Sequence, residues 1–289
     1  MLQQIVNSFA LGSVYVLVAL GLFLVFSTLH IPNFAHGEMF ALGAFLQHWL
    51  VVSVGWDFWA ALAVVTLATA LAGAALMIGV FRRLREVGFL AMFLGSLALA
   101  IVLQETIGLV WGKDPLGMTA PVGGVSDIAG VRISNYRLVV IVFALAIALC
   151  VGALVFRTVF GRNLRAMAQN SEISALTGIN VQRVGVMTFG LGAGLAGLAG
   201  ALLAPTTVLH PHIGFHLTMV SFIVLVIVGG AGRMCAVIFA AMILATLETV
   251  TVGYIDSGLK SSVVFLVLIA FLLVRPEGAR STSAAKVRL

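Results

Sequence analysis

The sequence has few charged residues for its length. Of its 289 residues, 9% are charged and 62% are hydrophobic, whereas soluble globular domains are about 25% charged and about 45–50% apolar. A soluble fold of this size cannot bury so much apolar surface, because its own surface must still be covered by polar groups. The composition excludes a cytosolic enzyme or a nucleic-acid-binding protein, and it predicts a membrane protein.

Cysteines and the common catalytic motifs are also scarce. Cys150 and Cys235 lie in apolar runs without CxxC spacing, so neither a disulfide framework nor a metal site is indicated. His210, His212 and His216 have no carboxylate close by in the sequence. GxxxxGK[ST], Gly-x-Ser-x-Gly and His-Glu-x-x-His patterns do not occur. We therefore expect no metal, no bound cofactor and no enzymatic activity in this chain, and any ATP used must be hydrolysed by another chain.

Nine apolar runs follow one another, separated by short polar breaks. They cover residues 5–29, 39–55, 58–81, 88–111, 137–156, 184–204, 217–232, 234–252 and 261–274. A helical membrane span takes about 20 apolar residues, so the chain has room for about eight to ten spans. The N-terminus lacks the basic region of a signal peptide, and the first run is expected to remain as a helix. We expect an all-α, polytopic transmembrane bundle that forms one domain over residues 1–289, with an irregular loop or short hairpin at 112–136.

Basic residues gather in some of the breaks and are rare in others. Lys and Arg near the ends of spans favour the cytoplasmic side. Placing 82–87, 157–183, 229–234 and the C-terminal tail in the cytoplasm puts 12 of the 16 basic residues there. The outer side then keeps Lys113, Arg132, Arg137 and Lys260. This distribution predicts an outer N-terminus and a cytoplasmic C-terminus.

The most unusual stretch lies between the first two apolar runs and reads Pro32-Asn33-Phe34-Ala35-His36-Gly37-Glu38. Polar groups at membrane depth are costly and often mark a transport pathway. Interrupted helices in transporters place free backbone groups near the substrate. One interpretation is a break within the membrane, with a translocation path along Asn33, His36, Gly37 and Glu38. The other is a cytoplasmic turn, with Glu38 as a helix N-terminal acid at the lipid interface.

Polar residues and glycines also interrupt later runs. Gln104 and Glu105 fall within 88–111, and Glu248 falls within 234–252. Each is expected to face the protein interior, where structural hydrogen bonding is the more common role. The stretch Gly229-Gly230-Ala231-Gly232 breaks a helix and either lines the path or forms a tight turn. We add Gln104, Gly229 and Gly230 to the candidate path.

The break at 157–183 contains a helix of its own. Residues 164–176 are predicted to be helical, carry Arg165, Gln169 and Glu172, and end near Gly178, which suits a C-cap. A short amphipathic helix on the cytoplasmic face suits the docking of another protein. The alternative is a helix that only lies on the membrane surface.

Four stretches resemble one family of transport proteins. They are Ile31–Phe45 (IPNFAHGEMFALGAF), Leu103–Pro115 (LQETIGLVWGKDP), Asn163–Val184 (NLRAMAQNSEISALTGINVQRV) and Leu272–Gly278 (LLVRPEG). In order and content they are similar to the permease subunits of ATP-binding-cassette importers for branched-chain amino acids, specifically the H-type permease. The first stretch resembles that family's INFAHG signature, and the third resembles its cytoplasmic coupling segment.

The resemblance implies a multi-pass permease of the bacterial inner membrane that pairs with a second, related permease. Two cytoplasmic ATPases, which bind ATP and Mg²⁺, would power it. A periplasmic substrate-binding protein would deliver branched-chain or similar small apolar amino acids, with urea and short amides as the alternative substrates. Related sugar permeases have an inverted repeat, and residues 214–233 are the candidate counterpart of 31–45.

The coupling segment keeps part of the importer pattern, which is Glu-Ala-Ala followed by Gly. Glu172 and Gly178 match it, while Ile173-Ser174 replace the two alanines. The resemblance therefore implies ATPase coupling through residues 157–183. We take Arg165, Gln169, Glu172 and Gly178 as the coupling residues.

Two other functional classes remain open at this point. An ion-coupled secondary transporter would need a buried acid, for which Glu38, Glu105 and Glu248 are candidates. A membrane enzyme acting on lipids would need catalytic polar residues at one membrane face, and His36 with Glu38 and His210 with His212 are the candidates. The predicted topology places those two pairs at different depths or faces, which counts against the enzyme.

Overall fold

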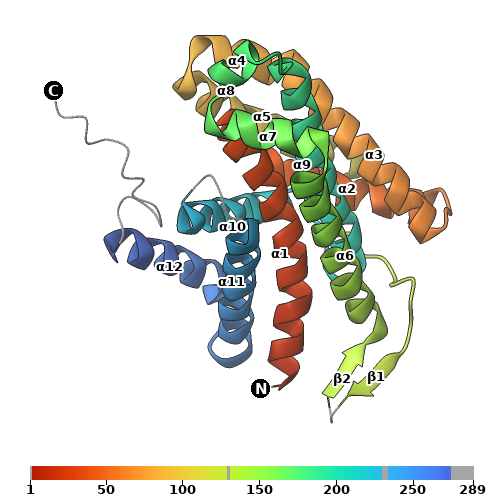
Figure 1. The fold of residues 1–289 in the computed structure, drawn as a ribbon. Helices are drawn as coiled ribbons and strands as arrows, with labels where there is room; N and C mark the ends of the chain where they lie inside the picture. The colour runs from red at the N-terminus through yellow and green to blue at the C-terminus, as the bar shows by residue number, and fades with distance from the viewer. Residues whose placement is uncertain (1, 129–130, 230–233, 275–289) are drawn as a thin grey trace.

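The computed structural model describes residues 2–128, 131–229 and 234–274. Most of these residues are helical, and the predicted all-α transmembrane bundle is confirmed (Figure 1). In chain order the elements are α1 (Leu2–Leu29), α2 (His36–His48), η1 (Trp49–Ser53), α3 (Phe58–Leu76), η2 (Met77–Phe81), α4 (Arg82–Val87), α5 (Phe89–Trp111), β1 (Val125–Ile128), β2 (Val131–Ser134), α6 (Asn135–Arg157), α7 (Val159–Gln169), α8 (Ser171–Leu176), α9 (Val181–Leu203), η3 (Ala204–Thr206), α10 (Ile213–Val228), α11 (Met234–Tyr254), η4 (Ser257–Leu259) and α12 (Lys260–Val274).

Each predicted apolar run corresponds to a helix or to two adjoining helices. Within the described residues, six helices are long and apolar enough to cross a membrane: Gln3–Leu29, Phe58–Val87, Phe89–Trp111, Asn135–Arg157, Val181–Thr206 and Met234–Tyr254. The other three runs form shorter helices, namely α2 with η1, α10 and α12. The short helices arise because polar or glycine-rich segments interrupt the apolar sequence before a full span is complete.

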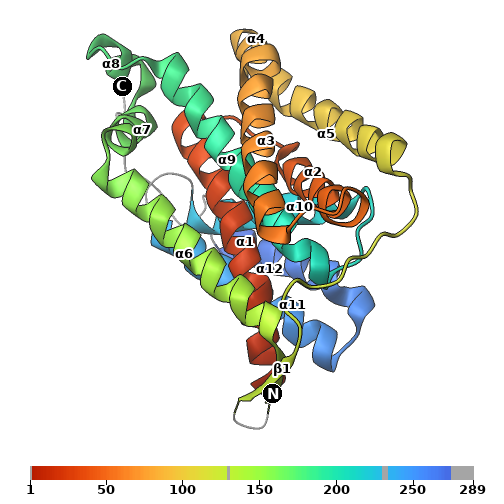
Figure 2. The same ribbon diagram turned by 90° about the vertical axis from the view of Figure 1, so that its right-hand side faces the viewer.

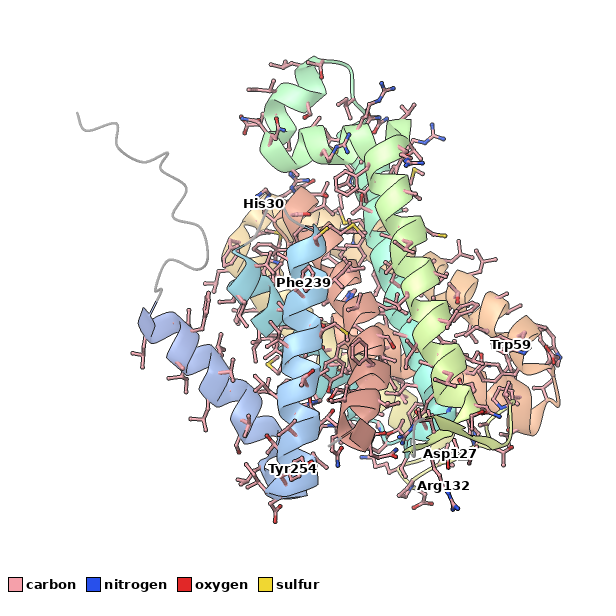
Figure 3. All side chains as sticks on the ribbon, turned by 60° about the horizontal axis from the view of Figure 1, so that its bottom comes forward. His30, Trp59, Asp127, Arg132, Phe239 and Tyr254 are labelled. Atoms are coloured by element: carbon pink, nitrogen blue, oxygen red, sulfur yellow. The ribbon has the colours of Figure 1, made fainter. Side chains whose placement is uncertain are left out.

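The two ends of the bundle differ in charge and in structure. In Figure 1, α4, α7 and α8 lie at one end, and the start of α1 with strands β1 and β2 lies at the other. Figure 3 shows Asp127, Arg132 and Tyr254 at this second end. Arginines gather on α4, α7 and the start of α9, so the positive-inside rule assigns the first end to the cytoplasm. The same rule assigns the second end to the outer side. Of the irregular loop and the short hairpin that the sequence left open for 112–136, the antiparallel hairpin β1–β2 forms there.

Helices α1 and α9 form the centre of the bundle and run in opposite directions (Figure 2). Helix α3 packs along α9, and α11 packs along α1. Glycines on α9 permit close contact with its neighbours: a β-carbon on Gly43 of α2 would lie 2.2 Å from the Gly197 carbonyl oxygen. In both halves a long helix is followed by a break, a short helix and another apolar helix, in the order α1, α2, α3 and again α9, α10, α11.

The break before the short helix of the second half comes slightly earlier in the sequence than predicted. The sequence suggested residues 214–233 as the counterpart of 31–45. In the structure the second break lies at residues 204–212, and α10 itself corresponds to α2. The break comes early because Pro205 and Pro211 interrupt the backbone hydrogen bonding of a continuous helix.

Candidate functional site

The break between α1 and α2 lies inside the protein. Helix α1 ends at Leu29, and His30 has a positive φ of 56° that turns the chain back. Asn33 is only 2% exposed, His36 is 1% exposed and Glu38 is fully buried. The Asn33 Oδ1 atom accepts a hydrogen bond from the Ala35 N–H at 3.1 Å, which shapes the turn. The exposed cytoplasmic turn, one of the two interpretations of the sequence, is therefore wrong.

The return of the chain starts α2 at the depth of the middle of α1. The His36 Nε2 atom lies 3.0 Å from the Val18 carbonyl oxygen. Val18 precedes the end of α1 by eleven residues, which is about 16 Å at 1.5 Å per residue. The first turn of α2 therefore lies within the bundle, where the N–H groups of His36 and Glu38 donate to the Asn33 and Ala35 carbonyl oxygens.

Helices α2 and α10 meet at their first turns. A β-carbon on Gly37 would lie 2.1 Å from both the Gly214 carbonyl oxygen and the Thr218 Oγ1 atom. The Gly37 N–H donates a hydrogen bond to Thr218 Oγ1 at 3.0 Å. Only glycine permits this distance between the two backbones, so the predicted site residue Gly37 has a clear structural reason. The junction brings two helix N-termini, each carrying a partial positive charge, to one point in the interior.

Three polar side chains from different elements form a connected chain beside this junction. The Gln104 Nε2 group of α5 donates to Glu38 Oε1 at 2.9 Å. The His212 Nδ1 atom lies 3.3 Å from Gln104 Oε1. The second oxygen of Glu38, Oε2, has no hydrogen-bond partner among the described residues. The structure therefore brings together Glu38 and Gln104 from the predicted path, whereas Glu105 points to the surface and pairs with Lys113 at 3.4 Å.

A second polar cluster was not predicted from the sequence. Glu248 of α11 is fully buried. The Tyr15 hydroxyl donates to its Oε2 atom at 2.6 Å, Lys260 Nζ lies 2.7 Å from its Oε1 atom, and His216 Nε2 lies 3.3 Å from the same Oε1 atom. We call Tyr15, His216, Glu248 and Lys260 the outer cluster. The sequence favoured structural hydrogen bonding for Glu248, with a coupling acid as the alternative, and no sequence pattern joins four residues from four helices.

The outer cluster lines a cavity of about 700 Å³. Its walls come from the first half of α1, the start of α6, the end of α9, residues 206–217, the end of α11 and the start of α12. These segments lie at the outer end of the bundle (Figure 1). His212 lines the same cavity, so the Glu38–Gln104–His212 chain reaches it from the α2–α10 junction.

Burial lowers the pKa of two groups at the edges of this cavity. His210, in the loop before α10, has its pKa lowered by burial and by the neighbouring His212, which favours a neutral ring. Burial also lowers the pKa of the Lys260 ammonium group. The described residues contain no group of three or more His, Cys, Asp or Glu side chains that could hold a metal ion.

The predicted coupling helix is two helices. Helix α7 ends at Gln169, and Asn170 adopts an extended backbone with φ −161° and ψ 111°. The Asn170 Oδ1 atom accepts hydrogen bonds from the N–H groups of Glu172 and Ile173, which makes Asn170 the N-cap of α8. The prediction of one continuous helix over 164–176 is therefore wrong, because the asparagine side chain competes with the helical hydrogen bonds.

The second helix of this segment, α8, ends near Gly178, as the sequence predicted, and it exposes apolar side chains. Gly178 has a positive φ of 86°, as a helix C-cap requires. Glu172 is exposed, and Ile173 and Leu176 are 59% and 87% exposed at the cytoplasmic end. Arg165 instead lies over the Phe156 ring, 5.4 Å from its centroid. Gln169 ends α7 and is exposed.

One predicted path residue does not lie at the α2–α10 junction, and another lies outside the described residues. Gly229 forms the left-handed C-cap of α10, with its N–H donating to the Leu225 and Val226 carbonyls. It therefore lies at the opposite end of α10 from Gly214. Gly230 lies outside the described residues.

Comparisons with known proteins agree with the resemblance seen in the sequence. The family model described as branched-chain amino acid transport system / permease component matches residues 4–273. The high-affinity branched-chain amino acid transport system permease protein LivH of Escherichia coli strain K12 is 30% identical over 292 residues, covering 96% of this chain and 94% of LivH. The permease protein BraD of Pseudomonas aeruginosa is 30% identical over 293 residues, with the same coverage of 96% and 94%.

One solved structure shares the fold. PsaBC from Streptococcus pneumoniae, in complex with a Fab, matches with a TM-score of 0.50 and 14% identity, covering 94% of this chain and 89% of the PsaBC chain. At that identity the likeness concerns the fold alone. The family match and the two relatives cover nearly the whole chain. The chain therefore belongs to the family of permease components of branched-chain amino acid transport systems.

Proposed function

We propose that this chain forms the translocation path for branched-chain amino acids in an ATP-binding-cassette importer, and that the path passes the junction of α2 and α10. The observation that carries the proposal is the meeting of two helix N-termini inside the bundle at Gly37 and Gly214. Interrupted helices in membrane transporters use such N-termini to contact anionic groups of a substrate. The relatives that match this chain are named for branched-chain amino acid transport.

The chemistry of the junction suits a small zwitterion with an aliphatic side chain. The partial positive charge of two helix N-termini favours a carboxylate. Glu38 has one carboxylate oxygen without a partner among the described residues, and an ammonium group could bind it. Phe34 stacks on Phe222 with ring centroids 4.3 Å apart and provides an apolar surface next to these polar groups. An aliphatic amino acid needs this combination of polar and apolar contacts.

The energy for transport comes, in this proposal, from ATPases that dock on α8. Glu172, Ile173 and Leu176 form an exposed surface at the cytoplasmic end. Leucine at 87% exposure contributes little to folding, yet it gives a partner protein an apolar anchor. The other partners in this proposal are a second, related permease and a periplasmic substrate-binding protein. The permease pair itself lies in the bacterial inner membrane.

The docking surface is tested by replacing Leu176 with Asp in a tagged chain expressed in its native host. Because the side chain is exposed, we expect normal amounts of folded protein but at least about tenfold less co-purified ATPase, since the loss of an interface anchor costs about 2 kcal/mol or more. The matched control is Val125→Asp, an exposed apolar residue of β1 at the outer end, which should retain the ATPases.

Two results would overturn parts of this proposal. Equal recovery of ATPases with Leu176→Asp and with the control would remove α8 as the docking surface. Recovery of the unaltered chain alone, active in liposomes without ATP, would replace the importer by a secondary transporter. Glu172→Lys provides a second test of the same surface and should separate ATP hydrolysis from transport.

A further inference from the structure

The outer cluster has features that helix packing alone does not require. Glu248 is fully buried, and three side chains from α1, α10 and α12 surround it. Removing an ion pair from water costs several kcal/mol per ion, and apolar side chains of similar size often pack as stably. A cluster of this kind at membrane depth is therefore a candidate for a functional role.

The cationic side of the cluster faces the cavity. The side chain of Lys260 is 40% exposed and that of His216 is 28% exposed, whereas Glu248 behind them is not exposed. Arg137, His210 and His212 also line the cavity. Of the described residues that line the cavity, Glu248 is the one acid. The cavity thus offers hydrogen-bond donors and positive charge, which suits a ligand with a carboxylate.

The lining of the cavity also contains apolar side chains. They include Leu11, Val140, Leu203, Ile213 and Leu217. The volume of about 700 Å³ lies within the range of roughly 300–1,000 Å³ that is typical of small-molecule sites. A few polar groups that fix orientation, within a mostly apolar wall, are typical of such sites. The ligand class that fits both the polar and the apolar side chains is a small carboxylate with an aliphatic side chain.

We propose that Lys260, positioned by Glu248, binds the carboxylate of an aliphatic amino acid in the outer cavity before the amino acid reaches the α2–α10 junction. This proposal rests on the proposed function for its substrate class. The Tyr15 hydroxyl keeps its 2.6 Å hydrogen bond to Glu248 when Lys260 turns toward a ligand, so the buried carboxylate retains a donor. Between this first site and the Glu38–Gln104 pair lie His216 of α10, which contacts Tyr15, and His212, the N-cap of α10, which contacts Gln104.

The site is tested by ligand binding to the purified transporter complex in detergent, without the substrate-binding protein. Saturation-transfer difference NMR detects weak ligands, and the probes are L-leucine and L-leucinamide, which lacks the carboxylate. We expect a leucine signal, strongest at its methyl groups, and little signal from leucinamide. Lys260→Met should weaken leucine binding about tenfold or more, because a charge-assisted hydrogen bond is lost. Lys113→Met, at an exposed lysine that also pairs with a glutamate, is the matched control and should bind normally.

The single variant leaves Glu248 buried without its cation and could unfold. The double variant Glu248→Gln/Lys260→Met removes both charges and keeps a hydrogen-bond acceptor for Tyr15. We expect it to melt within a few degrees of the unaltered protein and still to bind leucine about tenfold or more weakly. If the double variant binds leucine normally, the cluster only holds the helices together and the proposal is wrong.

The remaining outcomes also decide the proposal. Equal signals from leucine and leucinamide would contradict the carboxylate contact. A reduced affinity of Lys260→Met for the substrate-binding protein, with unchanged leucine binding, would assign the cavity to an acidic side chain of that protein instead. If leucine binds through Lys260 but the complete system does not transport leucine with ATP, the proposed function fails while the site stands. If the system transports leucine and Lys260→Met binds it normally, the site fails while the function stands.

Discussion

The crossing of α2 and α10 makes a quantitative prediction for Gly37→Ala. A β-carbon at residue 37 would lie 2.1 Å from the Gly214 carbonyl oxygen and 2.1 Å from Thr218 Oγ1. Ordinary contacts between such atoms are about 3.5 Å or longer. The two first turns must therefore separate by about 1 Å before the methyl group fits, and a close-packed interior resists such a movement.

The cost of this separation has two parts. Inserting a methyl group into a well-packed interior costs about 1–3 kcal/mol. A displacement of about 1 Å also breaks the 3.0 Å hydrogen bond from the Gly37 N–H to Thr218, which costs about 1 kcal/mol more. We therefore expect a destabilisation of about 2–4 kcal/mol. Gly214→Ala should behave similarly, because its β-carbon would lie 2.3 Å from the Gly37 carbonyl oxygen.

The assay is thermal unfolding of the purified complex in detergent, together with leucine uptake. Gly37→Ala should lower the apparent Tm by several degrees and reduce uptake, because it distorts the proposed path. The matched control is Gly79→Ala in η2, where a β-carbon would meet nothing within 4 Å and alanine favours the helix by roughly 0.5–1 kcal/mol. If Gly37→Ala melts and transports like the control, the two helices do not meet at Gly37 and the reasoning is refuted.

Two further variants test individual hydrogen bonds. Asp57→Ala removes the N-cap of α3, whose carboxylate accepts hydrogen bonds from the N–H groups of Trp59 and Ala60. We expect a loss of stability of about 0.5–2 kcal/mol in a thermal melt, with leucine uptake intact. An unchanged melt would exclude a stabilising role for the cap. Gln104→Leu removes a 2.9 Å donor from buried Glu38 and should lower stability by about 1–3 kcal/mol and also reduce uptake, and normal uptake would remove Gln104 from the path.

The helices could be predicted from the sequence because the apolar runs are long and their ends are marked by charges or glycines. Nine runs predicted nine helical regions. That the basic end faces the cytoplasm stays a prediction. The division of the coupling segment at Asn170 was missed. A single asparagine can either be accommodated in a helix or cap a new one, and neighbouring contacts decide between the two.

The candidate site could be predicted only in part. The polar and glycine residues between the first two apolar runs pointed to Glu38 and Gly37 before any contact was known. Their partners lie far away in the sequence: Gln104 is 66 residues from Glu38, and Glu248 is 233 residues from Tyr15. Such residues come together only when the helices pack. The hydrophobic periodicity of a single run does not indicate which helices pack against each other. Lys260 was interpreted only as an outer cation, because nothing in its own segment indicates the buried acid that it meets.

The most direct test of the central claim is ATP-dependent leucine uptake into proteoliposomes. They would contain this chain with its co-purified permease and ATPases, with ATP and Mg²⁺ on the cytoplasmic side and substrate-binding protein loaded with radiolabelled L-leucine on the other. The account predicts uptake that requires ATP, the ATPases and the binding protein, and that Gly37→Ala reduces. Uptake by this chain alone without ATP, or no uptake of any branched-chain amino acid by the complete system, would contradict it.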